Sequence, residues 1–357
     1  MPPIPQPMAD ILELARWTPS GDNAQPWRFE VSAGDRAVIH VHDTRSHCVY
    51  DFQGRATLLA LGALIETLHI AASSFGYRVR ITSQASLDAT HTKHNLDLQP
   101  DDSIKPDPLA ASITRRCVQR RPLSLRRLTL DQKRSLENAA APYSLRWLDT
   151  FGQRMEMASL LFMSAKTRLI SPEAYEVHRA IIAWRSRYSN DKVPDQALGL
   201  DPLTLRLMEW VMHSWKRVRF FNKYLAGTYM PRLQLDYIPG LACAAHFALI
   251  STASPRQPED FMAAGRAMQR FWLTATHLGL QLQPEMTPLI FSWYHNSHSR
   301  FSHIDAVQHT LPTIHKKLAK VMGDEVPGRG VFMGRIGHGK PAKSRSRRLP
   351  LDQLIIG

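Results

Sequence analysis

The residues best suited to chemistry lie in a polar segment near the start of the chain, Thr18 to Phe29 (TPSGDNAQPWRF). Pro, Ser, Gly, Asp and Asn in succession predict a turn that presents backbone N–H groups and short polar side chains in one place. Asn23 and Gln25 each offer an acceptor and donors, which suits a ring edge with alternating carbonyl and N–H groups. Taken alone, the pattern favours an ordinary polar turn.

Two strongly basic segments could bind a phosphate. Ile113 to Leu123 (ITRRCVQRRPL) holds four arginines within seven residues, and Arg335 to Arg348 (RIGHGKPAKSRSRR) holds six Lys or Arg; neither contains an acid. A guanidinium binds phosphate through two parallel hydrogen bonds, and its charge does not depend on pH. The alternatives are a solvated basic face for the first segment and a disordered basic tail for the second.

The polar turn resembles the hallmark of the FMN-dependent nitroreductase superfamily, roughly A-P-S-x-x-N-x-Q-P-W. Thr18 to Trp27 (TPSGDNAQPW) matches this pattern at all but the first position. The resemblance implies a nitroreductase-like fold, FMN as the cofactor, and Ser20, Asn23 and Gln25 as cofactor-binding residues. The chain is most similar to a long, fused (pseudo-dimeric) member, because one chain carries the parts that two subunits usually supply.

The first basic segment also resembles a family feature. Nitroreductases hold the FMN phosphate and the pyrimidine edge with a segment of the form R-x-S/T-x-R/K, and Arg116 to Arg120 is similar to it. The resemblance implies that Arg116 takes the phosphate and that Arg120 lies near N1 and C2=O, where negative charge develops on the reduced flavin. Val118 stands where the family usually has a hydroxyl, so only its backbone N–H could serve the phosphate.

The second basic segment has a counterpart in the family as well. Nitroreductases close with a Lys/Arg-rich segment that also reaches the phosphate. Arg347 and Arg348 match it best here, with Lys343 and Arg345 as weaker candidates. The resemblance therefore implies that Arg347 and Arg348 are cofactor-binding residues.

A stretch in the last third of the chain completes the family features. Gly279 to Pro288 (GLQLQPEMTP) resembles a segment that passes the flavin and donates a backbone N–H to N5. The resemblance implies that Pro284, Glu285 and Met286 contact the cofactor. We expect no catalytic acid or base, because the flavin performs the chemistry and the protein supplies binding, orientation and electrostatics.

Two long amphipathic helices are expected to position these segments. Leu58 to Phe75 and Phe261 to Leu278 each show apolar residues at steps of three and four. The two faces are separated by 203 positions throughout, and the glycine pairs Gly62/Gly265 and Gly76/Gly279 follow the same spacing. The pattern indicates a duplication; the alternative is that any two amphipathic helices followed by a C-terminal glycine align this way.

The predicted fold class is therefore α+β: antiparallel sheets flanked by helices, in two related halves at residues 1–105 and 106–357. Residues 91–108 are polar, hold three prolines and are expected to be a linker. The remaining patterns predict strands at 27–31, 37–42 and 78–82, a strand or short helix at 241–250, and helices at 8–17, 108–116, 130–141, 151–170 and 202–221.

An aromatic-rich insert at about 171–236 matches the family only loosely. It could form a lid over the flavin. Such a stripe more often belongs to a core, and we expect its aromatic side chains to be buried: Trp184, Trp210, Trp215, Phe220, Phe221 and Tyr224.

Composition excludes several classes of protein. The chain of 357 residues is 44% hydrophobic and 21% charged, which is globular composition. Its three cysteines (Cys48, Cys117 and Cys243) are far apart, so a disulfide framework is not expected and a reducing, cytoplasmic compartment fits. Leu241 to Ile250 is the most apolar run and is too short to span a membrane. No metal is expected at the histidine clusters His40/His42 and His295/His298/His303.

Three functions follow from these patterns. The first is an FMN-dependent oxidoreductase that transfers hydride through flavin N5, uses NAD(P)H and a small-molecule substrate, and exists as a monomeric pseudo-dimer or a homodimer. The second is a non-enzymatic protein that sequesters FMN. The third is a nucleic-acid-binding protein, which the net charge of +14 allows. No DNA- or RNA-binding motif supports it, so we expect neither a nucleic-acid nor a membrane partner.

Overall fold

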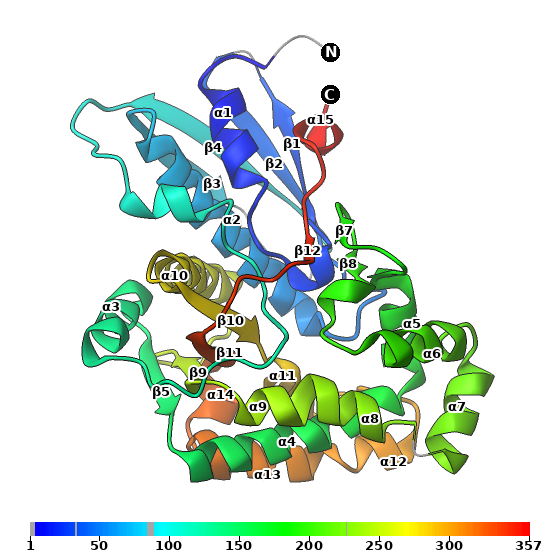
Figure 1. Ribbon diagram of the computed structural model, residues 1–357. Coiled ribbons are helices and arrows are strands. Elements are labelled where there is room, and N and C mark those ends of the chain that lie inside the picture. Colours follow the sequence, from blue (N-terminus) through cyan, green and yellow to red (C-terminus); the bar gives the residue numbers. More distant parts are fainter. Residues whose placement is uncertain (1–3, 33, 84–88, 226) are drawn as a thin grey trace.

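The computed structural model describes residues 4–32, 34–83, 89–225 and 227–357, in which two large sheets lie around a pair of long helices (Figure 1) and two further sheets have two strands each. The first sheet has the order β13 (Ile355–Ile356), β1 (Trp27–Val31), β2 (Arg36–His42), β4 (His91–Pro100), β3 (Tyr77–Ser83). The second has the order β10 (Leu280–Pro284), β11 (Gly330–His338), β9 (Ala245–Ile250), β5 (Ser144–Leu148). All pairs in both sheets are antiparallel except β13 with β1, so the predicted α+β class is confirmed.

The predicted linker at 91–108 is wrong, because residues 91–100 form strand β4 inside the first sheet. His94, Leu96 and Leu98 are buried on one face, and the two residues between them, Asn95 and Asp97, are polar and face outward. A strand with one solvated face alternates in this way. Its polar half made the segment resemble a linker.

The two long helices, α2 (Arg55–Ser73) and α10 (Pro258–His277), cross at the glycines that the sequence pairs. A Cβ added to Gly62 would lie 2.0 Å from the carbonyl oxygen of Met262, and one added to Gly265 would lie 2.1 Å from that of Leu59. A shift of 203 positions converts one contact into the other. Reciprocal contacts of this kind are typical of a two-fold axis between equivalent elements.

The order of elements on either side of this crossing is the same. The first half runs α1 (Met8–Ala15), β1, β2, α2, β3, β4, and the second runs α3 (Leu130–Ala140), β5, β9, α10, β10, β11. Within the sheets, β1-β2-β4-β3 corresponds to β5-β9-β11-β10. Gly76 and Gly279 follow their helices with the same φ of 72°. Common descent of the halves and the boundary near residue 105 stay predictions.

A long insertion separates β5 from β9. It contains α4 (Phe151–Leu169), α5 (Pro172–Ile181), the short strands β6 (Ile182–Ala183), β7 (Tyr188–Ser189) and β8 (Val193–Pro194), α6 (Pro202–Val211), α7 (Trp215–Tyr224), α8 (Tyr229–Arg232) and α9 (Ile238–Leu241). The helix predicted at 202–221 is thus two helices, since the Ser214 hydroxyl caps α7 by accepting from the Arg217 N–H.

The expectation that the aromatic side chains of the insert are buried is wrong. None of the six is buried, and Trp210, Phe220 and Tyr224 are 50%, 53% and 62% exposed. α6 has no buried residue, so it adds little to the core. By contrast, α4 buries eight residues and packs against α9, α11 (Thr287–Asn296) and α13 (Leu311–Met322).

One helix in the described part of the chain, Phe52–Ser73, is long and apolar enough to cross a membrane. The sequence pattern pointed instead to residues 241–250 as the most apolar run. Of the most apolar window of this helix, 89% is buried inside the protein. Leu61, Leu64 and Leu68 pack in the core below the first sheet, so the helix serves as a core helix.

Candidate functional site

A cavity of about 320 Å³ opens where the polar turn, α2, α10 and the loop after β10 meet. Ligand pockets in proteins typically begin near this volume. A second hollow of about 610 Å³ adjoins it, and Ser20, Asp22 and Tyr50 line both. Of the residues that the sequence assigned to a cofactor, eight line the first cavity: Ser20, Asn23, Arg116, Val118, Arg120, Pro284, Met286 and Arg348.

The polar turn holds an unusual backbone. Asp22, Asn23 and Gln25 have φ values of 51°, 65° and 46°, in the left-handed region that non-glycine residues seldom adopt. The Ser20 hydroxyl accepts a hydrogen bond from the Gln25 N–H at 2.9 Å and closes the turn. Backbone of this kind persists where the surroundings hold it, and it clusters at functional sites.

Residues of the insertion hold the amides of the turn. The Asn23 Nδ2 donates to the carbonyls of Asn190 at 3.1 Å and Lys192 at 3.3 Å, while its buried Oδ1 has no hydrogen-bond partner. The Gln25 Nε2 donates to the Asn190 carbonyl at 2.8 Å, and its Oε1 accepts from the Leu349 N–H. Gln25 therefore braces the turn and lines the adjoining hollow rather than the cavity itself.

Three arginines meet at one end of the cavity. Arg116 donates to the Trp17 carbonyl at 3.2 Å, and Arg348 donates to the next carbonyl, that of Thr18, at 2.8 Å. Arg345 donates to the Arg116 carbonyl at 3.1 Å. These bonds fix three guanidinium groups around the beginning of the polar turn, although they come from segments far apart in the sequence.

These guanidinium groups have no carboxylate partner among the residues that the structure describes. No ion pair found in the described part of the chain includes Arg116, Arg345 or Arg348. Burial, together with Arg345, lowers the pKa of Arg116 to about 10. Burial, together with Arg116 and Arg345, lowers the pKa of Arg348 well below its usual value. Like charges held together in a buried place call for an anion.

The C-terminal segment meets the cavity through different residues from those expected. Arg347 lies outside, where its exposed guanidinium stacks over the Tyr188 ring at 4.3 Å. The cause is the pairing of β12 (Arg345–Ser346) with β7, which continues as a hydrogen bond from the Arg347 N–H to the Ser189 carbonyl. Arg345, a weaker candidate from the sequence, takes the place instead. Lys343 is exposed and lines a separate groove.

At the end of β10 and in the loop that follows, two of the three residues expected to contact the cofactor line the cavity. Pro284 and Met286 line it, whereas the Glu285 side chain points away into the protein. Pro284 has no N–H, and the Glu285 N–H donates to the Met333 carbonyl at 2.9 Å. Of the three, the Met286 amide is therefore the remaining candidate for a backbone contact.

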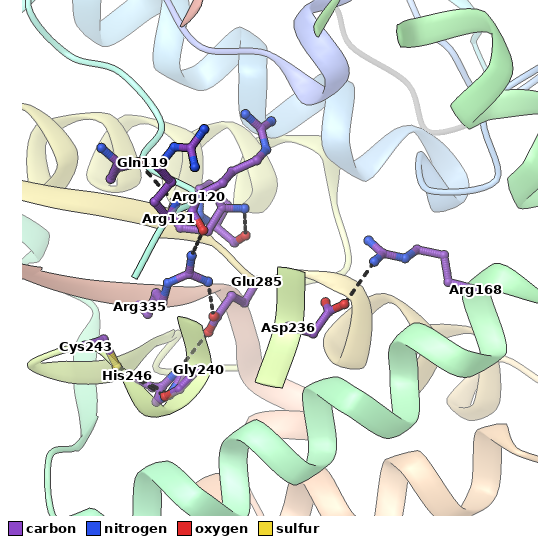
Figure 2. Close-up of polar contacts among 12 residues, drawn as sticks. Gln119, Arg120, Arg121, Arg168, Asp236, Gly240, Cys243, His246, Glu285 and Arg335 are labelled. Carbon is purple, nitrogen blue, oxygen red and sulfur yellow. Dashed lines mark hydrogen bonds and ion pairs between the residues drawn. The ribbon is translucent and has the colours of Figure 1, made fainter. Parts of the chain in front are cut away.

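Glu285 belongs to a buried charged cluster that no sequence pattern indicated (Figure 2). Its carboxylate accepts from His246 Nδ1 at 2.7 Å and from Arg335 Nη1 at 2.9 Å. Arg335 also donates to the Arg120 carbonyl at 2.6 Å, so the cluster supports the backbone that carries Arg120. The second ring nitrogen of His246 lies 2.8 Å from the Gly240 carbonyl, an arrangement in which both nitrogens donate.

The charges within this cluster depend on one another. Burial alone lowers the pKa of His246, but Glu285 and Cys243 outweigh it and raise the pKa to about 10. Burial raises the pKa of Glu285, but His246 and Arg335 outweigh it and bring the pKa below its usual value. His246 is thus an imidazolium that pairs with a carboxylate, which is a structural arrangement remote from solvent.

The structure adds cavity residues that sequence reasoning missed. Tyr50 and His178 share a hydrogen bond of 3.1 Å, and Arg168 from α4 lies beside them, 3.5 Å from Asp236. Asp22 faces Arg120 and Arg168; burial nevertheless raises its pKa. Asp22 stands at a variable position of the hallmark. Arg168 and His178 come from the insertion, where no motif could have marked them.

Within the described ranges, no group of three or more His, Cys, Asp or Glu side chains is placed to hold a metal ion. His42 stacks on His91 with a centroid distance of 4.1 Å, and the Glu30 carboxylate accepts from His40 Nε2 at 2.7 Å.

Comparison with known proteins found similar solved structures. A nitroreductase-like family protein from Bacillus cereus is 14% identical, with a TM-score of 0.35 over 69% of this chain and 94% of that one. A nitroreductase with bound FMN from Bacteroides fragilis is 12% identical (TM-score 0.35; 66% and 89%). A candidate nitroreductase from Anabaena variabilis is 11% identical (TM-score 0.37; 85% and 69%). No family model matches the chain, and no curated protein matches it.

Proposed function

We propose that this chain is an FMN-dependent oxidoreductase of the nitroreductase type. The observation that carries the proposal is a group of three guanidiniums, those of the buried Arg116 and Arg348 and the half-buried Arg345, which line one end of a cavity without a carboxylate partner in the described structure. A phosphomonoester would supply the missing negative charge and accept bidentate hydrogen bonds. The polar turn that resembles the nitroreductase hallmark borders the same cavity.

The unpartnered buried atoms around the cavity fit FMN. The Nε atoms of Arg116 and Arg345 are buried donors without an acceptor, which a phosphate oxygen would satisfy. The Asn23 Oδ1 is a buried acceptor without a donor, which the N–H of a flavin pyrimidine ring would satisfy. One ligand with an anionic end and an N–H on a ring edge therefore answers both requirements.

The apolar part of the wall suits an aromatic ring. Trp272, Met268 and Pro284 line the cavity together with Val118. Val118 packs here without a hydroxyl, so the phosphate depends on the guanidiniums. The Arg120 guanidinium provides positive charge away from the arginine triad, and Arg335 holds its backbone in place.

A bound flavin would supply hydride transfer through N5, with NAD(P)H as reductant and a small molecule as acceptor. The chain's own residues bind, orient and shield. Arg116, Arg345 and Arg348 hold the anionic end, Asn23 orients the ring edge, and Arg120 stabilises negative charge. Since all of them belong to one chain, a monomeric pseudo-dimer suffices for the site. Three free cysteines are consistent with the cytoplasm as its compartment.

The absorption spectrum of the purified protein tests this proposal. We expect bound flavin with its visible bands, and bleaching of these bands when NADPH or NADH is added under anaerobic conditions. A colourless protein that takes up no added FMN would overturn the proposal. Reoxidation by a panel of nitroaromatic and quinone acceptors then defines the second half-reaction.

The second candidate, a non-enzymatic FMN-sequestering protein, is favoured by the way the insertion covers the turn. The carbonyls of Asn190 and Lys192 accept hydrogen bonds from Asn23 in the turn, and Val193 lines the cavity. A ring enclosed in this way would exchange slowly and meet nicotinamide poorly. Tight FMN binding without bleaching by NAD(P)H, or without turnover with any acceptor, supports this candidate over the enzyme.

A further inference from the structure

Exposed apolar side chains are concentrated in one part of the insertion. Of the 17 large hydrophobic residues that are exposed in the described structure, nine lie between residues 203 and 238. Those on α6, α7 and the residue after α7 are Leu203, Leu207, Trp210, Phe220, Tyr224 and Leu225. We call this set the α6–α7 face. It lies at the edge of the molecule, away from both sheets (Figure 1).

Ring contacts join the two helices of the face through the half-buried Phe221. Leu203, Leu207 and Trp210 fall four and three positions apart and so share one side of α6. Trp210 meets Phe221 at a centroid distance of 5.8 Å, Phe221 meets Phe220 at 6.2 Å, and Phe220 meets Tyr224 at 5.2 Å. Scattered single hydrophobic residues need no explanation, but a joined group of this kind marks an interaction surface.

The charge of this surface is positive. α7 (WKRVRFFNKY) carries Lys216, Arg217, Arg219 and Lys223 and no acid. The Arg217 guanidinium lies 4.5 Å from the centroid of Trp210, and the Lys223 ammonium lies 5.0 Å from that of Tyr224. Cations and exposed aromatic rings are therefore interleaved.

A broad groove extends this basic surface beyond α6. Arg121, Lys340 and Lys343 line it together with Arg206 and Trp210 of α6. Of its acids, Glu209 pairs with Arg185 at 3.2 Å, Asp201 caps the start of α6, and Asp195 accepts from backbone N–H groups of 185 and 186. The acids of the groove are thus engaged, and the basic side chains dominate toward solvent.

The combination of charge and apolar area identifies the occupant. A second copy of the chain docked face to face would place the four cations of α7 against the same four cations, which is unfavourable. A basic amphipathic helix with exposed aromatic residues fits the interface of a bilayer with anionic headgroups. We propose that the α6–α7 face docks the protein on the surface of an anionic lipid membrane.

The sequence predicts no membrane partner, and this proposal departs from that prediction. The proposed binding is peripheral and requires no spanning segment. The apolar residues of the face would enter the headgroup region, and the cations of α7 would meet lipid phosphates. The core helix Phe52–Ser73 takes no part, because it stays buried in the protein.

Co-sedimentation of the full chain with vesicles tests the proposal. We expect binding to vesicles of phosphatidylcholine with 30% phosphatidylglycerol at low salt, weak binding to pure phosphatidylcholine, and release at 0.5 M salt. Because each cation near such a surface contributes about fivefold, Lys216→Gln with Arg219→Gln should weaken binding about 30-fold. The double variant Phe220→Ser with Leu203→Ser leaves the charge of the protein unchanged and should weaken vesicle binding more strongly.

Matched controls come from the opposite side of the molecule, at α3. Leu130 is 73% exposed, close to the 75% of Leu203, so Leu130→Ser should leave binding unchanged. Arg127→Gln with Arg134→Gln removes two exposed cations there and should reduce binding less than twofold.

The proposal fails if the chain does not sediment with anionic vesicles, if neutral vesicles bind equally, or if controls and α7 variants behave alike. A dimer in sedimentation velocity that Phe220→Ser abolishes would instead assign the face to a second copy.

Discussion

The two halves of the molecule share an order of elements but differ in the connection that leads into their first strand. In the first half, residues 16–26 join α1 to β1 and include the polar turn; in the second half, residues 141–143 join α3 to β5. The first connection is long enough to carry a turn with side chains directed into a cavity. The second is a tight corner, so of two equivalent places only the first carries a turn that borders the cavity.

The connection between the first and second strands differs in the opposite sense, because it is short in the first half and long in the second. β2 begins at Arg36, five residues after the end of β1 at Val31, whereas β9 begins at Ala245, 97 residues after the end of β5 at Leu148, and α4 to α9 lie between them. Arg168, His178 and Val193 of this insertion face the cavity at the turn of the first half. Both halves therefore line the cavity, which shows that an approximately symmetric frame can enclose an asymmetric cavity.

The largest expected effect concerns the frame. Gly62→Ala should lower the free energy of unfolding by more than about 3 kcal/mol, because the added Cβ would lie 2.0 Å from the Met262 carbonyl oxygen and both helices would have to move. Gly265→Ala should cost about the same, since its contact is reciprocal. Gly152→Ala in α4, where nothing lies within 4 Å of the added Cβ, is the control and should be neutral or stabilising. Urea denaturation measures all three, and unequal costs at Gly62 and Gly265 would contradict the symmetry.

The next effect concerns the site. Arg348→Ala should weaken FMN binding about 10- to 100-fold, since a charged hydrogen bond to phosphate contributes ~1.5–3 kcal/mol. Arg347→Ala removes the neighbouring, exposed guanidinium and should leave the dissociation constant within about twofold. Fluorescence titration with FMN compares the two variants. Equal losses would mean that the arginines act through overall charge rather than through a built phosphate site.

The buried pair of His246 and Glu285 should make the free energy of unfolding depend on pH. The folded-state pKa of His246 is raised to about 10, above its unfolded value near 6.5, so the folded protein keeps a proton that the unfolded chain releases. The stability from this pair is fully present below about pH 6.5 and is lost as the pH rises toward 10. Between about pH 7 and 8.5 the unfolding free energy should fall by about 1.4 kcal/mol per pH unit relative to His246→Gln. Parallel pH profiles of the two proteins would show that the ion pair contributes nothing.

The smallest effect distinguishes the frame from the insertion. Thr129 caps α3 in a capping box, and α3 packs on α10, so Thr129→Ala should lower the global unfolding free energy by about 1 kcal/mol. Asp201 caps α6, which buries no residue, so Asp201→Ala should change it by less than about 0.5 kcal/mol. Similar losses in both variants would show that α6 belongs to the same cooperative unit as the sheets.

Much of the site could be predicted because its residues lie in short local patterns. Ser20, Asn23, Arg116 and Arg348 line the cavity as expected. The sequence could not show that Arg345 rather than Arg347 lines the cavity, because the parallel pairing of β12 with β7 decides which guanidinium turns inward. Glu285 was assigned to the cofactor from its place in the loop, but its buried partner His246 lies 39 positions away and directs it elsewhere.

The sequence by itself determined the local structure and the chemistry at hand: two matching amphipathic helices, a polar turn of restricted residue types, and basic segments without acids. Backbone preferences and hydrophobic periodicity act over a few residues, so they can be recognised in the chain. The tertiary structure alone decided which arginines converge, that residues 190–192 hold the turn, and that the aromatic residues of the insertion face solvent. These outcomes depend on contacts between distant segments, and such contacts form only when the whole core packs.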